Sequence, residues 1–309
     1  MDKFLTVLQV IAPIFVSIFL GVLARRRGLM TGEQVQGLQQ FAVQFGLPCV
    51  VFNACLTASI GMESVSTMVL VLPCVLLSTF WAFRARKKRF PYHNFPQLFA
   101  AQETGMLGTP LFMILFGADQ AYRMGVLDLT QAVTAFPTIA ILTAQAGENP
   151  RAGQIVKKVL SSPLLIMSLL GLSLNLIGIG SWLEGIGILG MVTESTSFLA
   201  QPVSALMIFS VGYNFSLEKG SRGAIFRIAG IHFAVFALFC GIIQAALFLV
   251  PRVDALARWA VLLYCTLPAS YLAPGLGRSE DDAAMASGVC SVLTVVSLAV
   301  FCLMAAVAV

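Results

Sequence analysis

Charged residues are scarce in this chain. Lys, Arg, Asp and Glu make up 11% of its 309 residues, hydrophobic residues make up 58%, and the mean hydropathy is +0.90. An ordinary soluble domain contains roughly 25% charged residues. This scarcity excludes a soluble globular protein. Together with apolar runs of about 20 residues that recur along the chain, it predicts an all-α integral membrane protein.

Histidine and the common catalytic motifs are also missing. The sequence has two histidines, His93 and His232, and no HExxH, GxSxG or Walker pattern. It therefore lacks the side chains of a membrane-embedded enzyme or an ATP-driven pump. The seven cysteines lie in apolar segments without CxxC spacing, which is typical of packing residues. We expect no enzymatic activity, no cofactor, no metal site and no nucleic-acid partner.

What the chain does contain is a series of apolar runs separated by short polar segments. Hydropathy and turn signals predict ten spans. The first has no small-residue cleavage site, so we expect a retained helix rather than a signal peptide. The spans are predicted at residues 4–24, 36–58, 64–83, 96–117, 121–144, 159–179, 187–213, 224–249, 255–276 and 283–308.

Most of the 19 Lys and Arg residues follow the odd-numbered spans. By the positive-inside rule these loops are cytoplasmic, which predicts that both termini are extracytoplasmic and that the protein is a multi-pass protein of the inner (plasma) membrane. The basic residues of these loops are Arg25, Arg26, Arg27, Arg84, Arg86, Lys87, Lys88, Arg89, Arg151, Lys157, Lys158, Lys219, Arg222, Arg227 and Arg278.

The chain shows a weak internal repeat. "PIFVSIFLGVL" from Pro13 resembles "PLLIMSLLGLSL" from Pro163, and further matches pair Pro48 with Pro202, Pro110 with Pro268 and Met124 with Met285 in the same order. The order predicts two units, residues 1–150 and 151–309, of five spans each. Because five is odd, the second unit has to be inverted, which is the plan of many secondary transporters.

Two corresponding spans contain helix breakers. The fourth has Gly105, Gly108 and Pro110, and the ninth has Pro268 and Pro274. A proline inside a helix costs about 3 kcal/mol, and the freed peptide groups cannot face lipid. We predict that both helices break at the same depth and cross, so that two half-helix N-termini face a shared anion site. The alternative is that these prolines only kink their helices.

Several motifs together resemble the auxin efflux carrier family and its bacterial relatives, the malonate and malate permeases. They are "PIFVSIFLGVLARRRGLMT", "ETGMLGTPLF", and "LPASY" followed by "SVLTVVSL". The resemblance implies ten helices in two inverted repeats, a scaffold set of helices, and crossed helices four and nine that hold a small organic anion. The implied fold is similar to that of bile acid sodium symporters.

The expected substrate-binding residues surround the two breaks, with one amide from the second span. Asn53 has an alternative role in bridging helices, and the hydroxyl groups can instead bond carbonyls of their own helices. The set is Glu103, Thr104, Gly105, Gly108, Thr109, Pro110, Thr266, Pro268, Ala269, Ser270 and Asn53.

Three acidic residues are candidates for ion coupling. Glu103 stands where the family usually has asparagine, and burial would favour its neutral form. Our hypothesis is that Glu103 binds a proton together with an anionic substrate; alternatively, it caps amides at the break. Asp128 and Glu194 also lie in apolar segments. Asp128 has the alternative of solvation near a helix end, whereas Glu194 shares a polar face with Thr193 and Ser197.

These observations predict a secondary carrier of small carboxylates, such as malate or malonate, that works by alternating access and is proton-coupled. An auxin-like aromatic acid is another candidate substrate. The alternatives are a sodium-coupled anion symporter and a passive anion channel. A homodimer formed through the scaffold helices is compatible with the pattern.

Overall fold

The computed structural model of the protein describes residues 2–57, 62–146, 161–215, 222–250 and 253–308. Within these ranges all regular structure is helical, apart from one isolated β-bridge, and this confirms the all-α prediction. The first half contains α1 (Asp2–Arg26), α2 (Gly32–Phe41), the π-helical turn η1 (Ala42–Gly46), α3 (Leu47–Thr57), α4 (Met62–Lys88), α5 (Gln97–Ala100), the π-helical turn η2 (Thr104–Gly108), α6 (Thr109–Phe116), the 3₁₀ turn η3 (Ala118–Gln120) and α7 (Ala121–Gln145). The second half contains α9 (Pro163–Leu176), α10 (Ile179–Gly185), α11 (Leu189–Ala200), α12 (Val203–Asn214), α13 (Arg222–Leu249), α14 (Ala255–Thr266), the 3₁₀ turn η4 (Pro274–Leu276) and α15 (Glu280–Ala308).

The described residues form a multi-span membrane protein. Seven of their helices are long and apolar enough to cross a membrane, or eight if a bent pair counts as one span. The predicted spans 96–117 and 255–276 are not among these, because each is interrupted and leaves a shorter apolar helix, Thr104–Phe116 in one and Ala255–Thr266 in the other.

The predicted span 159–179 is shorter and more bent than expected. α9 ends at Leu176, and α10 follows at an angle of 71°. Gly178 between them has φ 78°, a left-handed conformation that ends a helix and that glycine adopts without strain. The first residues of that predicted span, and the predicted boundary between the two repeats at 150/151, lie outside the described residues.

Helix starts and interruptions follow from local sequence. Thr31 caps α2 by accepting from the amide of Gln34, whose side chain accepts from the Thr31 amide in turn, a capping box. Pro163 is the first residue of α9, where a helix has no use for an amide hydrogen. Pro202 separates α11 from α12 inside the predicted span 187–213. The N-terminal turn of each helix is therefore set by residues a few positions away.

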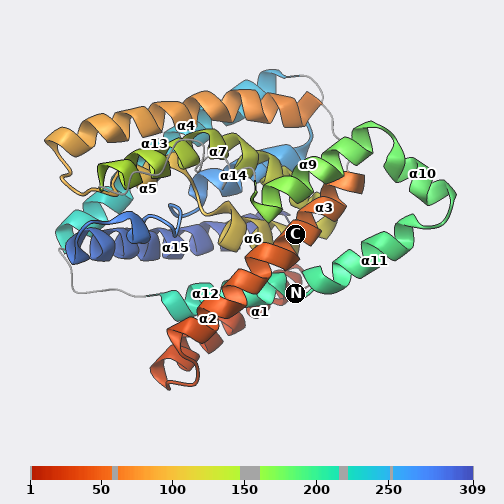
Figure 1. The fold of residues 1–309 in the computed structure, drawn as a ribbon, viewed down its shortest axis with the longest axis horizontal. Helices are drawn as coiled ribbons and strands as arrows, with labels where there is room; N and C mark the ends of the chain where they lie inside the picture. Colours follow the sequence, from red (N-terminus) through yellow and green to blue (C-terminus); the bar gives the residue numbers. More distant parts are fainter. Residues whose placement is uncertain (1, 58–61, 147–160, 216–221, 251–252, 309) are drawn as a thin grey trace.

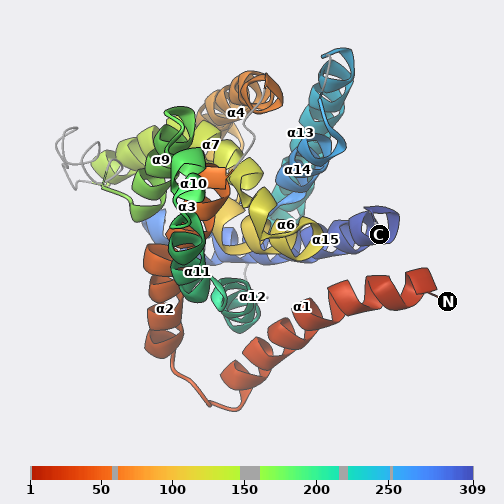
Figure 2. The same cartoon turned by 90° about the vertical axis from the view of Figure 1, so that its right-hand side faces the viewer.

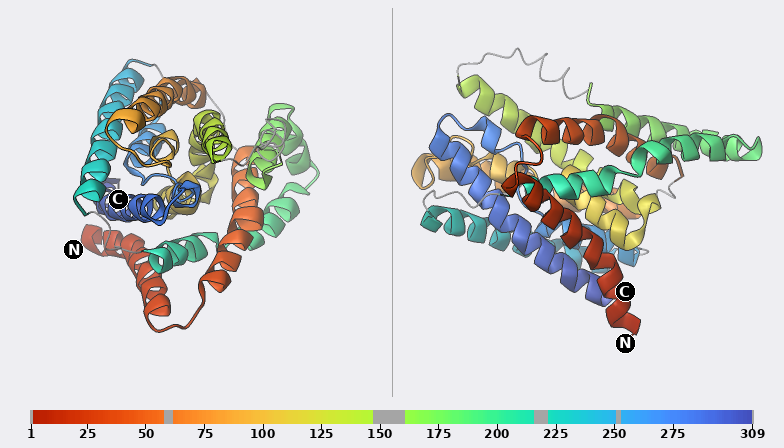
Figure 3. Two further views of the ribbon diagram at one scale, coloured as in Figure 1. Left: turned by 60° about the vertical axis from the view of Figure 1, so that its left-hand side comes forward. Right: turned by 90° about the horizontal axis from the view of Figure 1, so that it is seen from below.

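The helices pack into two groups (Figure 3). One, called here the core group, consists of α4 to α7 with α13, α14 and α15. The other, called here the frame group, consists of α1 packed on α12 and α3 packed on α9 and α11. The groups meet where α12 contacts η2 and α6, where α3 contacts α7, and where α1 contacts α15. In Figure 1 the segment from α9 to α11 extends to one side of the core group.

Two glycines allow close helix contacts within the frame group. A Cβ on Gly21 of α1 would lie 2.6 Å from the amide nitrogen of Tyr213 in α12, and closer still to the Phe209 carbonyl. A Cβ on Gly171 of α9 would lie 2.7 Å from the Phe52 carbonyl in α3. Small residues at such contacts are how helices associate in lipid, where apolar burial gives no drive. Figure 2 shows α1 lying along the edge of the molecule beside α12.

We expect Gly21→Ala to destabilise the protein by about 1–3 kcal/mol, because the added methyl group meets backbone atoms that cannot move aside. The measurement is thermal unfolding of the purified protein in detergent. Gly37→Ala in α2 is the matched control, since nothing lies within 4 Å of a Cβ there, and alanine favours a helix by about 1 kcal/mol over glycine. Equal melting temperatures for the two variants would contradict the close contact of α1 and α12.

Candidate functional site

Two interrupted segments meet inside the core group. Residues 101–103 separate α5 from η2, and residues 267–273 separate α14 from η4. Gln102 and Ala269 form an antiparallel β-bridge. The amide of Glu103 donates to the Pro268 carbonyl at 2.8 Å, and the amide of Ser270 donates to the Ala101 carbonyl at 3.0 Å. We call these two segments together the crossing.

Side chains satisfy the other peptide groups that the first break sets free. The Oε1 atom of Gln131 in α7 accepts from the Gln102 amide at 2.8 Å, and its Nε2 donates to the Gln102 carbonyl at 3.0 Å. The Gln131 amide thus takes the place of a neighbouring strand. Thr134 donates to the Ala100 carbonyl at 2.7 Å, and Ser78 of α4 donates to the Phe99 carbonyl at 2.9 Å. The carbonyls of the last turn of α5 therefore have protein partners, as buried peptide groups require.

Glu103 joins the two segments. The residue is 8% exposed, and its Oε1 accepts from the Met106 amide at 3.1 Å, as an N-cap of η2. Its Oε2 accepts from the amide of Tyr271, in the opposite segment, at 2.7 Å. The capping alternative therefore describes its contacts in this structure. The same contacts place a carboxylate at the centre of the crossing.

Asp128 of α7 lies in the same network. Its Oδ1 accepts from the hydroxyl of Thr104 and from Nε2 of Gln131, the latter at 2.9 Å. Tyr264 of α14 donates to the Oε1 of Gln131 at 3.1 Å. These hydrogen bonds place Asp128 at the crossing and not at a solvated helix end. Glu103 and Asp128 thus sit on either side of Thr104, and none of their hydrogen bonds within the described residues comes from Lys or Arg.

The break in the fourth span precedes Gly105, Gly108 and Pro110 and does not fall on them, which corrects the predicted position. Pro110 is the second residue of α6, where a helix tolerates a residue without an amide hydrogen. A Cβ on Gly108 would lie 2.6 Å from the Cδ1 of Leu267, so this glycine lets η2 approach the other segment. Thr109 is buried beside it.

The ninth span does not provide the predicted second half-helix N-terminus. α14 ends at Thr266, whose hydroxyl donates to the Leu263 carbonyl of its own helix at 2.8 Å. After the break only the three-residue turn η4 follows before α15. Pro268 and Pro274 explain the difference, because each lacks an amide hydrogen and two prolines so close together prevent a helix from re-forming. One helix N-terminus, that of η2 and α6, lies at the crossing.

Asn53 and Glu194 lie in the frame group. The side-chain nitrogen of Asn53 in α3 donates to the Thr193 carbonyl and to Ser197 of α11, each at 3.2 Å, and its oxygen accepts from Thr196 at 2.6 Å. This is the helix-bridging alternative. Glu194 is exposed on α11. Neither residue forms a hydrogen bond with the crossing among the described contacts.

Gln131, Tyr264 and Gln102 are the polar residues of the crossing that the sequence analysis missed. Turned so that its amide nitrogen faces acceptors, Gln102 donates to the Pro268 carbonyl at 3.1 Å and to Nε2 of His232 at 3.2 Å. A usable signal was present, since Asp128, Gln131 and Thr134 recur at three-residue spacing and so share one face of α7. Within the described residues, no group of three or more His, Cys, Asp or Glu side chains is placed to hold a metal ion.

The chain matches no protein-family model and no curated protein. The resemblance to the auxin efflux carrier family therefore rests on its sequence motifs. The helices themselves establish a multi-span helical membrane protein with two interrupted segments in contact.

Removing the Gln131 amide should leave both backbone groups of Gln102 without a side-chain partner. We expect Gln131→Leu to destabilise the protein by about 2–4 kcal/mol, because each unsatisfied buried group costs about 1–3 kcal/mol. Thermal unfolding in detergent measures the loss. Gln201→Leu, at an exposed position between α11 and α12, is the control and should change little. A Gln131→Leu protein as stable as this control would show that Gln131 does not hold the break.

Proposed function

We propose that the protein is a secondary transporter that works by alternating access. The observation that carries the proposal is the contact of two interrupted segments, with two buried carboxylates between them, inside a multi-span bundle. Interrupted helices near the middle of the membrane are where secondary transporters bind their substrates, and buried acids in spans are typical of ion pathways.

The packing supports ten spans in two inverted repeats. The two short apolar helices and the bent pair, added to the seven long helices, supply one segment for each predicted span. α1 packs on α12 in the way that α9 packs on α3, and each contact is made through the glycine, Gly21 or Gly171, that the sequence match pairs. An inverted repeat relates these two contacts. We infer that the core group moves against the frame group during transport.

The substrate class that we propose is a small carboxylate, such as malate or malonate, by resemblance to the bacterial permeases. Glu103 and Asp128 would repel an anion if both were ionised, so an anion has to enter with at least one proton or cation. We propose proton coupling at Glu103, with Asp128 as its neighbour. Sodium is the second candidate, because Asp128 and Thr104 present oxygen ligands side by side.

Glu103→Gln should abolish the stimulation of malonate uptake by an inward-acid pH gradient in proteoliposomes, because the amide cannot take up the proton. Glutamine keeps one of the two acceptor oxygens, so the variant's thermal stability is measured in parallel. Glu184→Gln, at an exposed position of α10, is the matched control. If Glu103→Gln keeps full pH-driven uptake, the proton site is elsewhere. Saturation and counterflow of labelled malonate separate a carrier from a passive channel, which shows neither.

We also propose that both termini face the extracytoplasmic side of the plasma membrane. A C-terminal alkaline phosphatase fusion should then be active and a C-terminal green fluorescent protein fusion dark, because each reporter functions on one side only. Fusions made after Lys88, in a loop predicted to be cytoplasmic, should give the opposite result. A fluorescent C-terminal fusion would reverse the proposed topology.

A further inference from the structure

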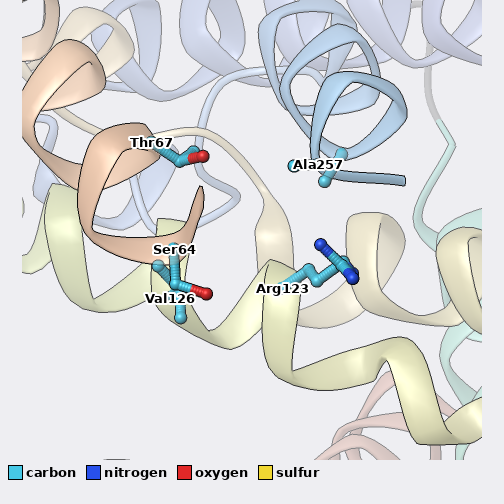
Figure 4. A pocket seen from close by; sticks show the side chains of 6 residues that line it. Ser64, Thr67, Arg123, Val126 and Ala257 are labelled. Atoms are coloured by element: carbon cyan, nitrogen blue, oxygen red, sulfur yellow. The ribbon is translucent and has the colours of Figure 1, made fainter. Parts of the chain in front are cut away.

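A pocket lies at the ends of three core-group helices, away from the crossing. It is lined by Ser64 and Thr67 of α4, Arg123 and Val126 of α7, and Ala257 and Ala260 of α14. Figure 4 shows Arg123 reaching toward the wall of α14 that carries Ala257, with Ser64 and Thr67 on the opposite wall. The charge rule predicts this end to be extracytoplasmic.

Arg123 is held in a geometry that recognises carboxylates. Its Nη1 and Nη2 donate to the two oxygens of Asp254 at 3.0 and 2.6 Å, and its Nε donates to Gln120 at 2.9 Å. A bidentate contact of this kind is how arginine binds planar carboxylates in general, whether they belong to a protein or to a ligand.

The two partners of this ion pair differ in exposure. The Arg123 side chain is 9% exposed, whereas the Asp254 side chain is 43% exposed. Asp254 can turn into water at little cost, but Arg123 cannot, because a buried cation left without a partner is strongly unfavourable. The carboxylate is therefore the exchangeable member of the pair, and any carboxylate that reaches Arg123 can replace it.

We propose that Arg123 is the centre of a carboxylate-binding subsite in which the Asp254 side chain occupies the position of the ligand. The small apolar residues Val126, Ala257 and Ala260 suit a short carbon chain, and the hydroxyl-bearing wall of Ser64 and Thr67 suits a second polar group. The ligand class is a short-chain mono- or dicarboxylate. This subsite is separate from the crossing, and binding alone tests it, so its failure would leave the proposed transport function untouched.

The decisive variant is Asp254→Asn. Asn keeps a side-chain oxygen to cap the Ala257 amide, which Asp254 does at 2.8 Å, and it removes the competing charge. Binding of malonate to the purified protein is measured by calorimetry at constant ionic strength, with chloride as the reference anion. If Asp254 occupies the site nine-tenths of the time or more, the variant should bind malonate about tenfold more tightly or better. The double variant Arg123→Gln/Asp254→Asn should lose this binding.

Asp119→Asn is the matched control, because Asp119 is an exposed acid in η3, next to the start of α7, and does not contact Arg123 in the described structure. It should bind malonate as the wild type does. Equal tightening in Asp119→Asn and Asp254→Asn would reduce the effect to general electrostatics and overturn the proposal. Wild-type affinity in Asp254→Asn would also overturn it and leave the ion pair a purely structural link between α7 and α14.

Ser64→Leu keeps the test open if Asp254→Asn does not fold. It fills the pocket and leaves the ion pair in place, so the wild-type binding of malonate at high concentration should disappear while the melting temperature is kept. Unchanged wild-type malonate binding in Ser64→Leu would place the carboxylate elsewhere and contradict the proposal.

Discussion

The hydrogen-bonding requirement of the backbone in lipid is the constraint on which this structure depends. A hydrocarbon core offers no partner to a free amide or carbonyl, so a helix can be interrupted in the membrane only where other groups replace the lost bonds. At the crossing each interrupted segment supplies bonds to the other, through the bridge of Gln102 with Ala269, and Gln131 completes the far edge. The two breaks therefore stabilise each other. Neither segment would be acceptable alone in a continuous lipid-facing helix.

The same requirement explains why the acids are where they are. Glu103 satisfies one amide in each segment, and Asp128 accepts from Thr104, the residue that follows Glu103. A structural capping role and a role in proton binding are compatible, because both use the same oxygens. The peptide groups of the first break already have protein partners, so a substrate would have to be recognised mainly by side chains and by the N-terminus of the η2–α6 helix.

The two helix groups are held by different kinds of contact. Within the frame group, glycines bring backbones together, as at Gly21 and Gly171. Between the groups, glycine faces a side chain: Gly105 lies opposite Leu47 and Gly125 opposite Val51. Backbone contacts through glycine fix two helices firmly, whereas apolar side chains have no directional bonds to break. This difference suits a rigid frame and a core that can shift against it.

The sequence by itself determined the all-helical class, the membrane location and the two spans that are interrupted, because hydropathy, proline and glycine act locally. It also determined that polar residues would gather at the interruptions. Only the tertiary structure decided that the fourth span breaks at 101–103 rather than at Pro110, that Gln131 and Tyr264 complete the network, and that Asn53 bonds to α11 instead. Those outcomes depend on which distant segment approaches each peptide group, and hydrogen bonds between residues over a hundred positions apart leave no local pattern in the sequence.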